Sequence, residues 1–205
     1  MRMRAKQKAL VLILGSFLIL SGCSLSPSMS GQVYPRVIME TELGTIVFAI
    51  DLENAPVTAA NFLQYVDEER FEGATFYRTV TMENQPGRDV KIEVIQGGVE
   101  FVEKPLRLPP IDHESTAVTG ILHEHGTLSM ARAEIGTASS EIFICIGDQP
   151  ELDFQGKRNP DGHGFAAFGQ VIKGMDVVQK IQAQKADGQM LVEPVKILKV
   201  KRKSF

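Results

Sequence analysis

The feature of this chain that most restricts its fold is a succession of short, β-rich segments separated by turn residues. Val, Ile, Thr, Phe and Tyr dominate these segments, and such residues favour strands. The segments occupy residues 37–41, 45–50, 74–80, 90–98, 126–132, 141–147, 164–172 and 193–201. Short strands with turns between them pair readily with one another, so the pattern predicts a mainly β protein, either an antiparallel barrel or a sandwich.

Only two segments show the period of a helix. In residues 55–71, apolar side chains recur at i, i+3, i+4 and i+7, and Pro56 suits the first turn. Residues 174–184 contain a second, shorter pattern of this kind. With so few helices, the strands must supply most of the core.

The first 22 residues have the composition of a signal peptide. The segment MRMRAKQK carries four basic residues and no acidic residue, and the apolar stretch Ala9–Leu20 follows it. This stretch is shorter than the ~20 residues that a membrane-spanning helix needs. The next residues, Leu20–Cys23 (LSGC), resemble a bacterial lipobox, in which the cysteine is acylated and becomes the new N-terminus. The alternative is an ordinary secretory signal with an incidental cysteine.

The lipoprotein interpretation divides the chain into three regions. Residues 1–22 form the signal peptide, residues 23–35 form a lipid-anchored flexible tether rich in Ser, Gly and Pro, and residues 36–205 form one folded domain. Acyl chains on Cys23 would attach the protein to a membrane. The sequence therefore predicts a protein of the bacterial cell envelope that faces the periplasm, and it leaves open which membrane carries the anchor.

The mature chain would be acidic. Without residues 1–22 it carries 18 basic and 25 acidic residues, which argues against a nucleic acid as partner. We expect a monomer by default. Cys145 would be the only cysteine besides Cys23, and its apolar neighbours predict a buried structural thiol.

Seven segments of the domain, in this order, resemble the cyclophilins, the peptidyl-prolyl cis–trans isomerases. They are APVTAANFLQYV, FYRTV, VIQGG, GTLSMARA, EIFICIG, GFAAFGQVIKGMDVV and VKI. The resemblance covers about residues 37–200. It implies a cyclophilin-like, eight-stranded antiparallel β-barrel capped by two α-helices, and an isomerase that acts on proline-containing polypeptides.

Arg78 is the residue to which the resemblance assigns catalysis. It lies in Phe76-Tyr77-Arg78-Thr79-Val80, which is similar to the strand that carries the one essential arginine of the family. Rotation about a peptide bond breaks its resonance, and the lone pair then localises on the prolyl nitrogen. A fixed N–H donor aimed at that nitrogen stabilises the twisted state. This chemistry requires no cofactor and no metal.

The resemblance also implies the residues that bind the substrate. Gln96 lies beside the arginine and would fix the substrate backbone, while Gly97 and Gly98 allow close approach of the backbone. The proline pocket would contain Phe143, Leu152 and Phe165, and the residues before the proline would lie along Met130, Ala131 and Arg132.

Glu93 and Val94 depart from the family pattern, because a Phe-Met pair occupies these places in the best-known cyclophilins. A carboxylate beside a proline pocket is costly unless it is paired. Glu93 could pair with Arg78 and weaken catalysis, or face solvent while Ile92 or Val94 supplies the apolar wall. It could also create a preference for basic residues near the proline.

Three further departures affect the site. Glu151 replaces the tryptophan of drug-sensitive cyclophilins, and the chain has no Trp, so we expect weak binding of cyclosporin A. Residues 153–164 are longer than the usual connection and contain several turn signals, which predicts a loop over one edge of the site. Arg132 and Glu141 replace the commoner asparagine and glutamine.

Histidines are the remaining candidates for chemistry. His123 and His125 would share a face of a strand, but two ligands are too few for a metal centre. His113 and His163 could add to them, yet a polar loop is the simpler interpretation.

Two functions therefore stay open. One is an active isomerase that assists the folding of envelope proteins. The other is a proline-peptide binding or chaperone module of low turnover, which both the Glu93 replacement and the lost pocket aromatics would favour.

Overall fold

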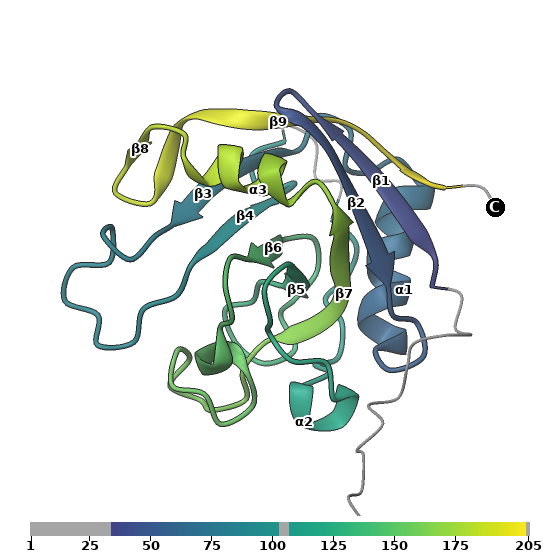
Figure 1. Cartoon of the computed structure of the whole chain (residues 1–205). Helices are drawn as coiled ribbons and strands as arrows, with labels where there is room; N and C mark the ends of the chain where they lie inside the picture. Colours follow the sequence, from purple (N-terminus) through teal and green to yellow (C-terminus); the bar gives the residue numbers. More distant parts are fainter. Residues whose placement is uncertain (1–33, 103–106, 204–205) are drawn as a thin grey trace, which may run out of the picture. The chain divides into compact units, whose positions relative to one another are not determined.

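The computed structural model of the chain describes residues 34–102 and 107–203 (Figure 1). The predicted signal peptide, the lipidation site Cys23 and nearly all of the tether lie outside the described residues. Apart from Tyr34 and Pro35, which fall at the end of the predicted tether, the described residues belong to the region predicted as the folded domain.

The domain is built on one antiparallel sheet. Its strands are β1 Arg36–Thr41, β2 Gly44–Ile50, β3 Thr75–Val80, β4 Val94–Gly98, β5 Thr127–Met130, β6 Ile142–Cys145, β7 Ala166–Lys173, β8 Ala186–Asp187 and β9 Met190–Arg202. The strand order is β1-β2-β7-β5-β6-β4-β3-β9, and pairing of β1 with β9 closes the sheet. The two-residue strand β8 pairs only with the first two residues of β9. The predicted eight-stranded antiparallel barrel is therefore confirmed.

In the described residues, three α-helices and one short 3-10 helix, η1 Pro150–Leu152, accompany the barrel. The two expected ones are α1 Pro56–Asp67, which packs against β7 and β9, and α3 Met175–Gln182, which packs against β2, β3 and β4 (Figure 1). The prediction of two helices missed α2 Thr116–Thr119, because a single turn is too short to show a helical period. None of the helices in residues 34–102 and 107–203 is long and apolar enough to span a membrane.

The start of α1 shows how a distant acidic residue completes a helix. Pro56 occupies the first turn, as the sequence predicts. The Glu114 carboxylate accepts hydrogen bonds from the backbone N–H groups of Val57 at 3.1 Å and Thr58 at 2.7 Å. These N–H groups have no partner within the helix, and a negative charge suits this end of the helix dipole.

Strands β4 and β6 are buried on both faces. Ile95, Ile142 and Ile144 point into the main core, while Phe143 and Cys145 point to the opposite face. Successive side chains of a strand alternate between faces, so burial on both sides gives the continuous apolar run seen in this part of the sequence.

The opposite face carries a second, smaller apolar cluster. Its buried members are Val80, Ile92, Val94, Phe143, Cys145 and Leu152, with Ala131 and Phe165 packed against them. Because this cluster lies outside the barrel, it provides an apolar floor for a site on the surface of the sheet.

Candidate active site

A cavity of about 570 Å³ opens above this apolar cluster. Most of the site residues expected from the sequence line it, namely Arg78, Val94, Gln96, Ala131, Arg132, Phe143, Leu152 and Phe165. Two of the expected residues do not line it. Met130 points into the main core, and Glu93 lies to one side. The alternation of β5 explains the position of Met130, because its neighbour Ala131 takes the outer face.

A β-bulge in β3 brings two neighbouring residues to the cavity. Phe76 pairs with Gly97 and Arg78 pairs with Gln96, so Tyr77 is the extra residue on its strand. In a regular strand Tyr77 and Arg78 would point to opposite faces, but the bulge lets both line the cavity.

Close contact between β3 and β4 supports this geometry. A Cβ atom on Gly97 would lie 2.5 Å from the carbonyl oxygen of Thr75 and 2.8 Å from the Cα atom of Phe76. Only glycine fits at this position, which agrees with the close backbone approach expected there.

Two side-chain amides hold the guanidinium of Arg78. Nη1 donates to Gln96 Oε1 at 2.6 Å, and Nη2 and Nε donate to Gln189 Oε1 at 2.6 and 3.1 Å. Within the described part of the chain, no carboxylate forms an ion pair with Arg78. Burial lowers the pKa of Arg78, yet an arginine stays protonated at any physiological pH. The site therefore contains an oriented cation with neutral partners.

Gln189 is a site residue that the sequence analysis missed. It lies in the turn between β8 and β9, 111 positions after Arg78. Its own amide donates to the carbonyl of Asn84 at 3.2 Å, which fixes the side chain. A glutamine in a polar turn carries no local signal of such a role, so only the three-dimensional structure could reveal it.

A chain of hydrogen bonds leads from Glu141 to Arg78. Tyr77 Oη donates to Glu141 Oε2 at 2.7 Å, and Gln96 Nε2 donates to Tyr77 Oη at 2.9 Å. An ionised carboxylate can only accept, so it fixes the direction of the other bonds in the chain. Gln96 must then turn its oxygen toward Arg78. Burial and the bond to Glu141 raise the pKa of Tyr77, which keeps its proton in place.

Gly98 provides the space for this carboxylate. A Cβ atom at this position would lie 2.5 Å from Oε2 of Glu141. Ser140 Oγ also donates to Glu141, to Oε1 at 3.0 Å. The charged group is thus held at a fixed place on the cavity wall.

Apolar residues form the pocket beside Arg78. The rings of Phe143 and Phe165 meet edge to face, with centroids 5.5 Å apart and an angle of 89° between their planes. Leu152, Ile92 and Val94 complete the lining on this side. The arrangement suits a small apolar ring that must lie close to a cation.

His123 supports Phe143 from behind. Its ring stacks on Phe143 with centroids 5.8 Å apart. Nδ1 lies 2.7 Å from Asp153 Oδ1, and Nε2 lies 2.9 Å from Ser129 Oγ. Although this is the order of an Asp-His-Ser triad, Ser129 is fully buried and does not reach the cavity.

The other histidines do not join His123. His125 Nδ1 accepts from the backbone N–H of Gly147, and His113 Nε2 lies 3.0 Å from the carbonyl oxygen of His163. No group of three or more metal-binding side chains is found in the part of the chain that the structure describes.

Glu93 is half-buried and does not line the cavity that contains Arg78. Its Oε1 lies 3.5 Å from Nε2 of Gln182 on α3, and it forms no ion pair with Arg78. Ile92 and Val94, its two neighbours, line the cavity instead. Ile92 and Val94 thus supply the apolar wall, as one of the three alternatives for Glu93 expected, but Glu93 itself is half-buried against α3 and does not face solvent fully.

The loop of residues 153–164 borders the cavity, and Arg158 and Asn159 line it. The Arg132 side chain holds this loop through Asp161, at 2.7 and 2.9 Å, and through the carbonyl of Gly164. The bond to Arg132 holds the pKa of Asp161 down at about 2. Sequence analysis predicted the loop over the edge of the site, but not the contribution of Arg158.

Comparisons with known proteins agree with this geometry. The family model described as cyclophilin type peptidyl-prolyl cis-trans isomerase/CLD matches residues 36–202. Peptidyl-prolyl cis-trans isomerase A of Dickeya dadantii is 34% identical over 166 residues, which cover 80% of this chain and 79% of that protein. A peptidyl-prolyl cis-trans isomerase of Acinetobacter baylyi is 32% identical over 205 residues, and 97% of each chain is covered.

Solved structures show the same fold. A crystal structure of a cyclophilin type peptidyl-prolyl cis-trans isomerase from Cryptosporidium parvum matches with a TM-score of 0.66 at 18% identity, covering 84% of this chain and 99% of that one. A second structure of the same protein, in the presence of the dipeptide Ala-Pro, matches with a TM-score of 0.65. With the family match over most of the chain and the two bacterial relatives, the conclusion is direct: this chain belongs to the cyclophilin-type peptidyl-prolyl cis–trans isomerases.

Proposed function

We propose that Arg78 catalyses rotation about the bond before proline by donating a hydrogen bond to the prolyl nitrogen. The planar amide resists rotation by ~18–20 kcal/mol because its nitrogen lone pair is delocalised. In the twisted state the lone pair belongs to the nitrogen and can accept a hydrogen bond. A donor that is already oriented there stabilises the transition state more than either planar isomer, which is the condition for catalysis.

One observation carries this proposal: neutral amide oxygens hold the guanidinium at the cavity. A guanidinium has five N–H donors, and Gln96 and Gln189 accept from three of them. One N–H on each terminal nitrogen is left for a substrate. A carboxylate partner would compete with the weakly basic prolyl nitrogen for these donors, whereas an amide orients the group and leaves its charge intact.

The rest of the cavity then has defined roles in substrate binding. The proline ring would occupy the apolar pocket of Phe143, Phe165 and Leu152 beside Arg78. The residues before the proline would lie along Ala131 and the backbone of Arg132, because this segment borders the pocket and leaves the sheet at the end of β5.

The cellular setting is a second part of the proposal. The LSGC motif at Leu20–Cys23 supports acylation of Cys23 and attachment to a bacterial membrane. The isomerase would then act on proline bonds of envelope proteins that fold close to that membrane. Metabolic labelling with an alkyne analogue of palmitate tests the anchor: label should enter the wild-type chain in a bacterial host and be absent from Cys23→Ala. Equal labelling of both would refute it.

Exchange NMR on an Ala-Pro peptide tests the catalytic role. We expect the wild-type chain to accelerate cis–trans exchange and Arg78→Ala to lose most of the acceleration while its spectrum stays that of a folded domain. Arg36→Ala is the matched control, because Arg36 is exposed at the start of β1 and does not line the cavity. If the folded wild-type chain binds the peptide without accelerating exchange, the barrel is a proline-recognition module instead.

A further inference from the structure

We propose that Arg158 forms a subsite for a carboxylate that the substrate carries just after its proline. This inference rests on the proposed function, because it assigns a substrate feature to the same cavity. It adds a preference for chemical class, namely an acidic residue after the proline or a chain that ends there with a free carboxylate.

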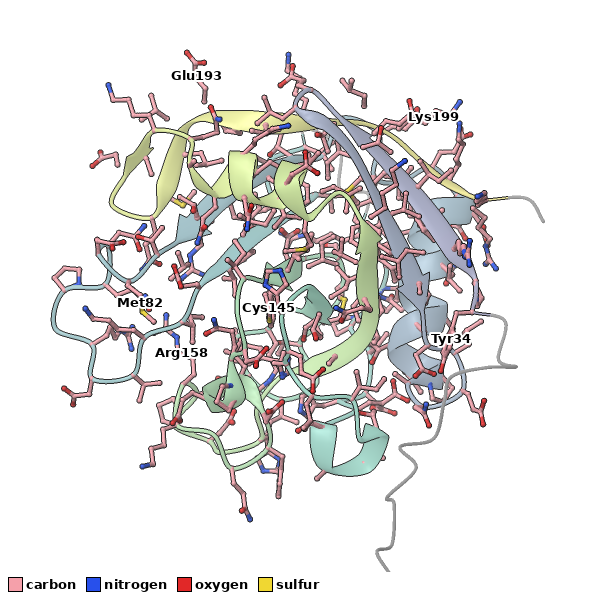
Figure 2. The ribbon with its side chains drawn as sticks, viewed as in Figure 1. Tyr34, Met82, Cys145, Arg158, Glu193 and Lys199 are labelled. Atoms are coloured by element: carbon pink, nitrogen blue, oxygen red, sulfur yellow. The ribbon has the colours of Figure 1, made fainter. Side chains whose placement is uncertain are left out.

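The first support is the geometry of Arg158. It lies in the loop of residues 153–164 and lines the cavity, where Figure 2 shows it beside the connection between β3 and β4. Nη1 donates to Gln85 Oε1 at 2.9 Å and to the carbonyl of Val90 at 2.8 Å. Gln85 is itself buried and bonded to the backbone of Thr81 and Ile92. One edge of the guanidinium is therefore fixed to a rigid support.

The second support is the charge of this region. In the described part of the chain, no carboxylate forms an ion pair with either Arg158 or Arg78, and both line one cavity. Burial lowers the pKa of Arg158, and repulsion from Arg88 and Arg78 lowers it further. An anion bound between such groups would relieve the repulsion, and guanidinium–carboxylate hydrogen bonds are among the strong ones in proteins.

The third support is the position of Arg158 along β4. Glu141 lies against Gly98 at one end of this strand, whereas Arg158 bonds to Val90, ahead of the other end. A strand of five residues spans roughly 16 Å, so the acidic and basic parts of the cavity are well separated. Arg107 and Arg132 also line the cavity, but each is already paired with a carboxylate, Glu100 and Asp161. A substrate carboxylate would therefore be repelled by Glu141 and attracted at the Arg158 end.

The Glu141 end and the Arg158 end of the cavity also indicate in which direction the substrate chain runs through the site. Ala131 N donates to the carbonyl of Glu141 at 2.8 Å, so the segment proposed for the residues before proline lies at the acidic end. Arg78 pairs with Gln96, the middle residue of β4. The residue after the proline then extends toward Arg158. A side-chain carboxylate of Asp or Glu and the terminal carboxylate of a short chain would present the same chemistry there.

Peptide titrations on the full-length chain, purified in detergent, test the subsite. The probes are Ala-Ala-Pro-Glu-Ala-amide and its Gln counterpart, with Ala-Ala-Pro-Gln as free acid and as amide for the terminal carboxylate. A third pair carries Glu or Gln before the proline. We expect the Glu peptide to bind about fivefold tighter than the Gln peptide at low salt when the acid follows the proline, and no tighter when it precedes it. Comparison of the two carboxylate sources then shows which one reaches Arg158.

Three variants assign the effect to Arg158. The Glu-to-Gln affinity ratio should fall to about one in Arg158→Gln and stay partly above one in Arg158→Lys. The matched control is Lys157→Gln, which removes a charge from the adjacent, exposed residue outside the cavity and should keep the wild-type ratio. Should Arg158→Gln fail to fold, the Nε–H resonance of Arg158 in the wild-type chain should still shift with the Glu peptide and not with the Gln peptide.

The outcomes separate this inference from the proposed function. Equal affinity for both peptides in a chain that accelerates exchange would overturn the subsite alone, as would a Glu preference that survives in Arg158→Gln. Failure to accelerate exchange in any peptide would overturn the proposed catalysis, whatever the affinities show.

Discussion

Replacing Tyr77 by phenylalanine tests whether the hydrogen-bond chain from Glu141 orients Arg78, the arginine that we propose to be catalytic. Tyr77 is only 5% exposed, and its hydroxyl makes two bonds, to Glu141 at 2.7 Å and from Gln96 at 2.9 Å. The variant keeps the ring in place and removes both bonds. Gln96 then loses the acceptor of its amino group, so Arg78 alone holds the amide, and the amide fixes the guanidinium less firmly.

The size of the effect can be worked out from these contacts. A neutral hydrogen bond contributes about 1 kcal/mol and one to a charged group about 1.5–3 kcal/mol. The variant frees Glu141 Oε2 and Gln96 Nε2, whose residues line an open cavity, so water can replace part of the lost hydrogen bonding. We therefore expect the free energy of unfolding to fall by about 1–2 kcal/mol. If the poorer orientation of Arg78 destabilises only the transition state, by about 1 kcal/mol, then kcat falls about fivefold while KM changes little.

Exchange NMR gives kcat and KM, and urea unfolding gives the stability. Glu141→Gln is the matched control, because a glutamine can still accept from Tyr77 but no longer forces the direction of the bond, so its loss should be smaller. A folded Tyr77→Phe chain with wild-type kcat would refute the reasoning, since Arg78 would then be oriented without this chain of bonds. A rise in KM alone would show that Tyr77 acts on binding instead.

Three other predictions concern stability and ligand binding. The pKa of Asp161 is about 2 in the folded chain against a usual 3.8, so its ion pair with Arg132 stabilises the fold above about pH 4, and this stability is lost as the pH falls toward 2. Asp161→Asn should lower the free energy of unfolding at pH 7 by about 1 kcal/mol. Urea unfolding of the variant should also show a smaller loss of stability between pH 4 and pH 2. Burial raises the pKa of the Cys145 thiol, so the thiol should not react in the native chain. In a Cys23→Ser chain, mass spectrometry should show that iodoacetamide modifies Cys145 only after urea is added. Rapid labelling of the native chain would contradict this. Cyclosporin A should bind weakly, because Glu151 takes the place of the tryptophan of drug-sensitive cyclophilins. Glu151 is half-buried, and its carboxylate accepts from Lys157 N at 2.8 Å. A tight complex in calorimetry would show that this tryptophan is dispensable.

The barrel was predictable because its signals are local. Alternation and β-branched composition mark the strands, and the two longer helices show their period over two or more turns. The segment before β4 shows the limit of this reasoning. The sequence predicts a strand from Val90, but β4 begins at Val94, because the side chains of Gln85 and Gln149 accept from the N–H groups of Ile92 and Glu93.

The site was predictable only where a residue matched an ordered motif. Arg78, Gln96 and Phe143 were found in this way, whereas Tyr77 reaches the cavity through a bulge that leaves no mark in composition. Gln189 comes from a turn far along the chain. Such residues gain their roles from contacts between distant segments, and no local pattern encodes those contacts.

The position of the acidic residue suits the catalytic role that we propose for Arg78. A carboxylate in contact with Arg78 would hold the guanidinium in an ion pair and compete for the donors that the proposed mechanism offers to the prolyl nitrogen. Glu141 instead lies two hydrogen bonds away, through Tyr77 and Gln96. At that distance it fixes the direction of the amide that faces Arg78 and leaves the charge of Arg78 available. The bulge is essential to this arrangement, since in a regular strand Tyr77 and Arg78 would point to opposite faces and the carboxylate would have no connection to the arginine.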